Sequence, residues 1–351
     1  MEIFNDLYQQ FDLKGKEILD FFSNNMTIEK EHIKYILSLN GKERYLMYEV
    51  AKRVKNFFTV DYVSIKALIE FSNYCSKNCD YCGIRRDNLN INRYRMSNEE
   101  IINSALKAKK WGLDTIVLQS GEDNFFKDED LMSIIKIIRE KTKLPVSISI
   151  GERSLESYLK FKKSGAIRTL IKHESINKEL FDDIHPDKNY YNRVNILKYT
   201  DSIGYVTGSG FIVGLPNQTD DDMADDIIFM RDENVRMIGI GPLIASKNTP
   251  FENMKNGSVV KTMNACCAAR LTVPKAQMPA TTALGTLNYN SHYESLKYFC
   301  NVVMVNITPD IYRKNYNIYD NKAKIDFFET LKELKKRNLK VSPITMKALS
   351  R

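Results

Sequence analysis

Three cysteines in one short stretch, Cys75-Ser76-Lys77-Asn78-Cys79-Asp80-Tyr81-Cys82, are the residues with the clearest chemical potential. They follow a strand-like run at 63–71, and their close spacing lets a single loop bring all three thiolates to one metal centre. Thiolates are the usual protein ligands of iron–sulfur clusters and of zinc. A closed structural site normally has four protein ligands, so three sulfurs predict an open site that leaves one position for a substrate or cofactor.

The main alternative for these cysteines is zinc, completed by a distant fourth ligand such as Cys300 or one of the four histidines. A disulfide framework is not expected, because six cysteines in 351 residues are not a cystine-rich composition and the N-terminus shows no secretory leader. A chance cluster of core thiols is disfavoured, because Ser, Lys, Asn and Asp between the cysteines mark a polar loop. The open iron–sulfur site is therefore the favoured interpretation.

The composition is that of an ordinary globular enzyme, with 43% hydrophobic and 27% charged residues. No apolar run approaches the roughly 18 residues that a membrane span needs, so we expect a cytoplasmic protein without a membrane anchor. The net charge is +8, but lysines are spread along predicted helices and acids are interspersed among them. This pattern indicates a solvated surface, and we expect no nucleic-acid partner.

From residue 63 onwards β-type runs alternate with amphipathic helical segments, which is typical of parallel βα units. Ser97 with Glu100 forms a predicted capping box, and Thr219 a predicted helix cap. Strands are predicted at 63–71, 115–119, 146–150, 169–171, 210–213, 237–240, 278–282 and 302–305. Eight such strands predict an α/β fold of the closed (β/α)8 TIM-barrel type. We expect an N-terminal helical extension over 1–60, the barrel over 61–321, and a C-terminal helix and tail over 322–351 packed on the barrel.

In such a barrel the functional residues follow the carboxyl ends of the strands, and most polar clusters of this chain do so. Gly121 allows close backbone approach to a ligand, and the acid Glu122 beside it can accept hydrogen bonds from an ammonium group. Glu152 suits ribose hydroxyls or an amine, whereas Lys172 suits a carboxylate. The seventh and eighth strands lead to hydroxyl, aromatic and guanidinium groups suited to an anionic substrate: Thr281, Thr282, Tyr312 and Arg313. Each residue alone could be an ordinary turn or surface residue, but their shared position predicts one site.

A cluster site surrounded by groups for an ammonium, a carboxylate and ribose hydroxyls suits S-adenosylmethionine (SAM). The motif Cys75-x-x-x-Cys79-x-Tyr81-Cys82, with an aromatic residue before the last cysteine, resembles the signature of radical SAM enzymes. Longer stretches resemble, more narrowly, the HydE branch of FeFe-hydrogenase maturases, relatives of biotin synthase. They are 81–88 (YCGIRRDN), 93–97 (RYRMS), 118–123 (LQSGED), 213–216 (VGLP), 239–242 (GIGP) and 279–283 (PATTA). The resemblance covers residues 30 to 320, approximately.

The resemblance implies a 4Fe-4S cluster on Cys75, Cys79 and Cys82, with the amino and carboxylate groups of SAM on the fourth iron. An electron from a ferredoxin- or flavodoxin-type donor would cleave SAM to methionine and a 5′-deoxyadenosyl radical. The implied SAM contacts are Tyr81, Gly121, Glu122, Glu152, Lys172 and Met237, and the implied cavity-facing residues are Thr281, Thr282, Tyr312 and Arg313. The implied substrate is a small or organometallic molecule, in that branch a cysteine-bound iron carbonyl–cyanide precursor whose sulfur the radical attacks. Other maturation proteins are candidate partners.

Some positions depart from the branch. Lys172 stands where arginine is usual, which keeps the charge but loses the bidentate fork. The stretch 242–250 lacks the usual His-Pro-Asp before Thr-Pro, and no cysteine follows Cys300 to hold an auxiliary cluster. Adjacent Cys266 and Cys267 fall in a predicted helix and are expected in the core. Three alternatives stay open: a sister enzyme such as a methylornithine synthase-like mutase or a maturase of another metallocofactor, a non-enzymatic zinc protein, and an RNA-modifying radical SAM enzyme.

Overall fold

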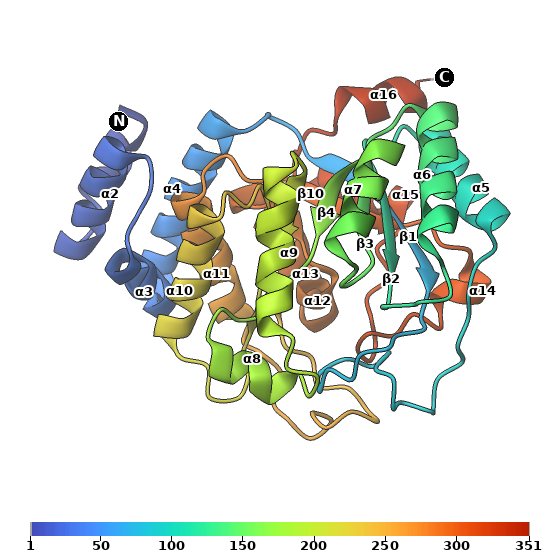
Figure 1. Cartoon of the computed structure of the whole chain (residues 1–351). Coiled ribbons are helices and arrows are strands. Elements are labelled where there is room, and N and C mark those ends of the chain that lie inside the picture. Colours follow the sequence, from blue (N-terminus) through green and yellow to red (C-terminus); the bar gives the residue numbers. More distant parts are fainter. Residues whose placement is uncertain (1, 351) are drawn as a thin grey trace.

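A barrel of parallel strands organises the computed structural model, which describes residues 2–350 (Figure 1). The eight-stranded sheet has the order β7-β5-β4-β3-β2-β1-β10-β9. Its strands are β1 (Ser64–Ser72), β2 (Ile116–Ser120), β3 (Val146–Ser149), β4 (Ala166–Leu170), β5 (Val206–Ser209), β7 (Met237–Ile238), β9 (Pro279–Ala280) and β10 (Val302–Asn306). The two edges meet where Gln277, just before β9, bridges to Met237. The backbone N–H of Ile238 donates to the Gln277 carbonyl at 2.8 Å, which closes the barrel.

The fifth strand of the barrel lies at Val206–Ser209, before the predicted range 210–213, and the sixth ends at Ile238, two residues short of the predicted 237–240. β5 ends at Ser209 and a short β6 (Ile212–Val213) follows, and β6 pairs with β8 (Gly241–Pro242) in a separate two-stranded sheet. The interruption lies at Gly210, where a Cβ atom would stand 2.0 Å from the Gly239 carbonyl oxygen. The segments around Gly210 and Gly239 therefore approach too closely for a side chain at position 210, and the regular strand ladder stops there.

Helices alternate with the strands around the barrel. They are α5 (Asn98–Lys110), α6 (Asp128–Thr142), α7 (Leu155–Ser164), α8 (Lys178–Ile184), α9 (Tyr190–Ser202), α10 (Asp220–Asp232), α11 (Val259–Thr272), α12 (Thr282–Leu287), α13 (Tyr289–Tyr298), α14 (Asp310–Arg313), α15 (Phe327–Lys336) and α16 (Pro343–Leu349). The Ser97–Glu100 capping box and the Thr219 cap are confirmed. The last predicted helix begins at Phe327 rather than at residue 322, and α16 was not predicted.

A helical layer precedes the barrel, formed by η1 (Glu2–Phe4), α1 (Asn5–Tyr8), α2 (Leu13–Asn25), α3 (Lys30–Ser38) and α4 (Gly41–Phe58). These helices lie along one flank, with α3 and α4 next to α10 and α11 (Figure 1). The domain boundaries expected at residues 60 and 321 remain predictions. None of the helices among residues 2–350 combines the length and apolar character needed to cross a membrane.

Candidate active site

A cavity of about 380 Å³ lies at the carboxyl ends of the strands, and the three motif cysteines border it. Cys75, Cys79 and Cys82 are partly buried and carry no disulfide. The other three cysteines, Cys266, Cys267 and Cys300, are buried and do not line the cavity. The core position expected for Cys266 and Cys267 is therefore confirmed.

Arg93 fixes the shape of the cysteine loop from within. Its guanidinium donates hydrogen bonds to four backbone carbonyls of the loop, those of Asn73, Ile84, Arg85 and Asn88. Arg93 pre-shapes the loop because a planar, permanently charged donor fork can satisfy several carbonyls at once. Arg93, the first residue of the stretch 93–97 that resembles the HydE branch, therefore stabilises the conformation of the cysteine loop.

Two contacts tie this loop to the rest of the barrel mouth. The Ser76 N–H donates to the Glu122 carbonyl at 2.9 Å. The Gly83 N–H donates to the Ile318 carbonyl at 2.8 Å, and a Cβ atom on Gly83 would stand 2.3 Å from the Asn317 carbonyl oxygen. Gly83 thus allows the segment around residue 318 to close over the cysteine loop.

Burial of the thiols disfavours their ionised form. It raises the pKa of Cys79 to about 12 and also raises the pKa of Cys75 and of Cys82. Bound iron reverses this preference, because a coordinating thiol is deprotonated. The sulfur of Cys75 already accepts a bond from the Glu122 N–H at 3.4 Å, and such a donor stabilises sulfur that carries negative charge.

The β2 turn lies directly against the cysteine loop. A Cβ atom on Gly121 would stand 2.3 Å from the Tyr74 carbonyl oxygen and 2.8 Å from Cys75 Cβ, so only glycine fits. Gly151, at φ +72°, makes similar room for the side chain of Glu122. Glu122 Oε1 then accepts the Glu152 N–H at 3.0 Å, which joins the β2 and β3 loops.

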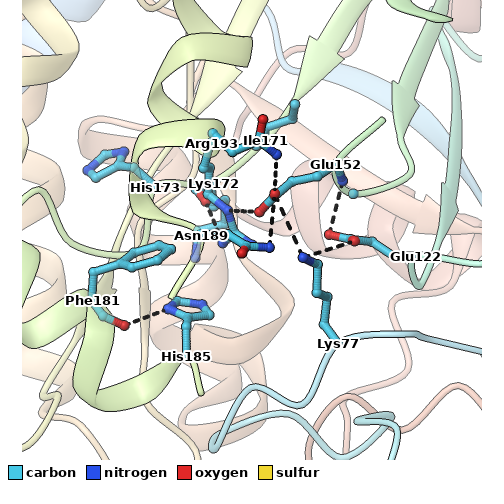
Figure 2. A network of polar contacts seen from close by, with 12 residues as sticks. Lys77, Glu122, Glu152, Ile171, Lys172, His173, Phe181, His185, Asn189 and Arg193 are labelled. Carbon is cyan, nitrogen blue, oxygen red and sulfur yellow. Dashed lines mark hydrogen bonds and ion pairs between the residues drawn. The ribbon is translucent and has the colours of Figure 1, made fainter. Parts of the chain in front are cut away.

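An alternating network of carboxylates and cations covers one side of the cavity (Figure 2). Lys77 reaches from the cysteine loop to 3.7 Å from Glu122 and 3.8 Å from Glu152. Glu152 also accepts from Arg193 of α9 at 3.1 Å and from Asn192 at 2.6 Å. Burial raises the pKa of Glu122, whose charge the neighbouring Lys77 and Arg193 favour. Positively and negatively charged groups of the network therefore lie within a few ångströms of one another, where a ligand can contact both.

The β4 turn adds a second pair of opposite charges. Lys172 Nζ lies 2.9 Å from Glu174 Oε2, and both residues line the cavity. Arg193 donates to the Lys172 carbonyl at 3.2 Å, so this turn is connected to the Glu152 network. Tyr81 of the cysteine motif also lines the cavity, and its hydroxyl lies 3.1 Å from His185 Nε2.

The remaining wall is formed by the β9 turn and the segment after α14. Thr281 and Thr282 line the cavity as predicted, together with Tyr316, Tyr319 and Lys322. Lys322 forms an ion pair with Glu70, which lies near the end of β1. The side chain of Glu70 is fully buried. Asn306 donates to the second Glu70 oxygen at 2.6 Å.

Three predicted residues lie outside the cavity lining. Tyr312 turns away, donates to Glu100 at 2.8 Å and stacks on Tyr94 at a ring distance of 4.9 Å. Arg313 donates to the Asn306 carbonyl, and Met237 packs lower in the barrel with its sulfur 3.8 Å from Lys66 Nζ. Their places in the lining are taken by residues that the motif reasoning missed: Lys77, Glu174, Arg193, Tyr316, Tyr319 and Lys322. Only Lys77 and Glu174 had a sequence signal, namely adjacency to motif residues.

A model of the radical SAM superfamily matches residues 69–230. The [FeFe] hydrogenase maturase subunit HydE of Thermotoga maritima is 40% identical over 311 residues, which cover 88% of this chain and 89% of that protein. The 3-methylornithine synthase of Methanosarcina acetivorans is 26% identical over 279 residues, covering 79% of this chain and 78% of that protein.

Solved structures show the same fold. The crystal structure of methylornithine synthase (PylB) matches with a TM-score of 0.83 at 22% identity, covering 95% of this chain and 98% of that one. The structure of HydG, a maturase of the [FeFe]-hydrogenase, matches with a TM-score of 0.80 at 20% identity, covering 96% of this chain and 78% of that one. The predicted (β/α)8 barrel is confirmed.

The protein is thus an enzyme of the radical SAM superfamily, with a 4Fe-4S cluster and SAM as its cofactors. Within the superfamily, the chain belongs to the HydE family of [FeFe]-hydrogenase maturases. The predicted family, enzyme class and cofactors are confirmed by these matches.

The described residues fit these cofactors. In a 4Fe-4S cluster each thiolate binds a different iron, so the sulfurs must surround the cluster instead of meeting at one point. All three thiols border the cavity, and among residues 2–350 no three His, Cys, Asp or Glu side chains converge around the position of a single ion. The adjoining network offers carboxylates for ammonium and hydroxyl groups and cations for a carboxylate.

Proposed function

We propose that this protein acts as a HydE-type maturase that generates a 5′-deoxyadenosyl radical from SAM and uses it on a small or organometallic substrate in the barrel. Cys75, Cys79 and Cys82 hold the cluster, which supplies the electron for cleavage of SAM. The observation that carries the proposal is the cysteine loop and the charge network on one cavity, in a chain 40% identical to a HydE maturase.

The charges of the cavity suit this pair of cofactors. Glu122, Glu152 and Glu174 are matched in number by the cations Lys77, Lys172 and Arg193, so the protein groups of the network balance. An oxidised cluster with three thiolates carries one net negative charge, and SAM, as a sulfonium with an ammonium and a carboxylate, carries one positive charge. The two cofactors therefore neutralise each other inside a low-dielectric cavity, where unbalanced charge is costly.

The residues of this chain have distinct roles in the proposed reaction. The Gly121–Glu122 turn and Glu152 receive the amino group and ribose hydroxyls of SAM, and Lys172 and Arg193 face its carboxylate. Tyr81 lines the side of the cavity on which the cluster binds. Thr281 and Thr282, together with Tyr316 and Tyr319, bound the space left for the substrate and exclude water from the radical.

The first experiment is anaerobic reconstitution with iron and sulfide, followed by addition of dithionite and SAM. We expect release of 5′-deoxyadenosine and an electron paramagnetic resonance (EPR) signal of a reduced 4Fe-4S cluster that shifts when SAM is added. A colourless protein that binds one zinc and ignores SAM would contradict the proposal.

The ligand assignment is tested by Cys79→Ala. We expect no cluster and no 5′-deoxyadenosine, because two thiolates cannot hold the cluster. Circular dichroism should stay that of the wild type, since the substitution lies in a loop. A variant that still releases 5′-deoxyadenosine refutes the assignment.

The substrate is tested by a maturation assay. We expect that hydrogen evolution by an immature [FeFe]-hydrogenase, mixed with the other maturation proteins, requires this chain with an intact cluster. Formation of 3-methylornithine without any effect on the hydrogenase would instead identify a sister mutase.

The proposed setting is the cytoplasm, with a ferredoxin- or flavodoxin-type protein as electron donor. A purified flavodoxin and its reductase should replace dithionite in the 5′-deoxyadenosine assay. Activity with dithionite but none with a reduced flavodoxin or ferredoxin would contradict this choice of donor.

A further inference from the structure

Glu174 lines the cavity in a backbone conformation that a glutamate rarely adopts. Its φ is +63°, in the left-handed region, and its carboxylate pairs with Lys172 at 2.9 Å. This conformation is unfavourable for a residue other than glycine, and such strain persists only where surrounding structure enforces it. The question is which residues enforce it.

Backbone hydrogen bonds to the fifth strand region fix the peptide groups on both sides of Glu174. Its N–H donates to the Gly210 carbonyl at 3.1 Å, and its carbonyl accepts the Ile212 N–H at 3.2 Å. Both bonds lie at the interruption between β5 and β6. They hold the backbone of Glu174, and the ring of the preceding residue, His173, adds a side-chain anchor to the same turn.

The ring of His173 is buried on the far side of the chain from Glu122 and Glu152 (Figure 2). Its Nδ1 lies 2.8 Å from the hydroxyl of Ser209, and its backbone N–H donates to the same hydroxyl at 3.2 Å. Its Nε2 lies 3.3 Å from Asp226 Oδ1 on α10. Phe229, one turn along α10, packs against the ring edge-on at 5.0 Å. Ser209, His173 and Asp226 thus form a buried row of polar contacts, and none of the three lines the cavity.

Helix α10 also holds the backbone that follows Glu174. Asp226 Oδ1 accepts the Ile176 N–H at 2.5 Å, and Asp222 accepts from the Asn177 side chain at 2.7 Å. Asp226 is fully buried, and burial raises the pKa of its carboxyl group, an effect that the contacts with His173 and with the Ile176 N–H oppose. One carboxylate of α10 therefore clamps the turn on both sides of Glu174.

We propose that His173 and Asp226 are positioning residues that hold the Lys172–Glu174 pair against SAM. Neither residue lines the cavity, so each acts through Glu174 and Lys172. The inference rests on the proposed use of SAM. It adds that the buried contacts of His173 with Ser209 and Asp226 position the groups that bind SAM, besides stabilising the fold.

The test is a double-mutant cycle with His173→Phe and Glu174→Gln. The dissociation constant of SAM is measured by titrating SAM into the reduced, reconstituted protein and following the EPR shift of the cluster. We expect each single substitution to raise the constant roughly tenfold, the effect of one misplaced charged hydrogen bond. The double variant should match Glu174→Gln within about twofold, because no carboxylate remains to be positioned.

Additive effects, or a lowered melting temperature with an unchanged SAM constant, would overturn the proposal and leave His173 a packing residue. If His173→Phe does not fold, Asp226→Asn enters the same cycle, because its amide oxygen still accepts the Ile176 N–H. The matched control is His32→Phe in the helical layer, where His32 accepts from the Glu29 N–H at 3.2 Å. This control should change the melting temperature only. A wild-type cluster that ignores SAM would instead refute the proposed function itself.

Discussion

At the scale of single residues, the site depends on places where no additional atom fits. Gly121 allows the β2 turn to lie against the cysteine loop, with the Tyr74 carbonyl oxygen 2.3 Å from the position of a Cβ atom. That neighbour is backbone and cannot rotate away. The carbon of one side chain would therefore displace the loop that carries Cys75.

Gly121→Ala should reduce cluster incorporation, measured as iron and sulfide per chain after reconstitution. It should also lower the free energy of unfolding by about 1–3 kcal/mol, the usual cost of overpacking. Gly239→Ala is the matched control, because the nearest atom to its Cβ position is 3.9 Å away. Equal cluster content in both variants would contradict the argument.

Lys66 is a second residue whose surroundings make a measurable prediction. It lies buried below the cavity, donates to Gln277 at 2.5 Å, and has Arg168 nearby. Burial, with the repulsion of Arg168, lowers the pKa of Lys66 to about 7 from its ordinary value near 10.5. Between these two pH values the unfolded chain binds a proton that the folded chain does not, so stability rises with pH across that window.

Lys66→Met should reduce this slope, which for one group is at most about 1.4 kcal/mol per pH unit. Met fits beside Met237, and Gln277 keeps its bond from Arg168 at 3.1 Å. Urea unfolding at pH 7, 8 and 9 measures the slopes. An unchanged slope in the variant would show that Lys66 is charged in the folded protein.

At the scale of elements, one asparagine joins the helical layer to the barrel. Asn264 of α11 donates to the Leu37 and Leu39 carbonyls at 3.1 and 2.9 Å, at the turn between α3 and α4. Its oxygen accepts the Tyr48 hydroxyl of α4 at 2.7 Å. All of these contacts are buried, so each polar atom depends on the others.

Asn264→Leu should lower the free energy of unfolding by about 2–4 kcal/mol, because it leaves buried carbonyls and a hydroxyl without partners. Tyr48→Phe should cost about 1 kcal/mol, since it removes one donor only. SAM affinity should be unchanged in both variants, because neither residue lines the cavity. A loss of SAM affinity would indicate that the layer influences the site.

At the scale of the whole molecule, the cavity is built by residues from almost the full length of the barrel. Its lining begins with Leu68 and Glu70 on β1 and ends with Lys322 after β10. Because these residues are brought together only by folding, a ligand that fills the cavity binds the folded barrel and not the unfolded chain. Ligand binding and global stability are therefore linked.

SAM at 100 times its dissociation constant should stabilise the reconstituted protein by about 2.7 kcal/mol. Anaerobic urea unfolding with and without SAM measures the difference. The Cys79→Ala variant should show a much smaller gain, since SAM loses its contact with the cluster. Equal gains in both proteins would place SAM away from the cysteine loop.

The sequence alone determined the features whose causes are local. The spacing of Cys75, Cys79 and Cys82 keeps the ligands on one loop, and the alternation of strands and helices requires a parallel barrel with its site at the carboxyl ends. Because Gly121, Glu122 and Glu152 directly follow strands, their place at the mouth was also predictable. The 40% identical relative confirms the family that the motifs indicated.

Tertiary structure decided which side chains of the longer connections reach the cavity. Tyr312 and Arg313 lie on the single turn of α14 and face Glu100 and the β10 backbone, while the next residues cross the mouth. That crossing is set by distant contacts, such as the Gly83 N–H with the Ile318 carbonyl, and it brings in Tyr316, Tyr319 and Lys322. Arg193 likewise enters from the first turn of α9, a helix whose sequence shows no motif. Contacts between segments that are distant in the sequence determine which of these residues reach the cavity, and no local sequence pattern indicates them.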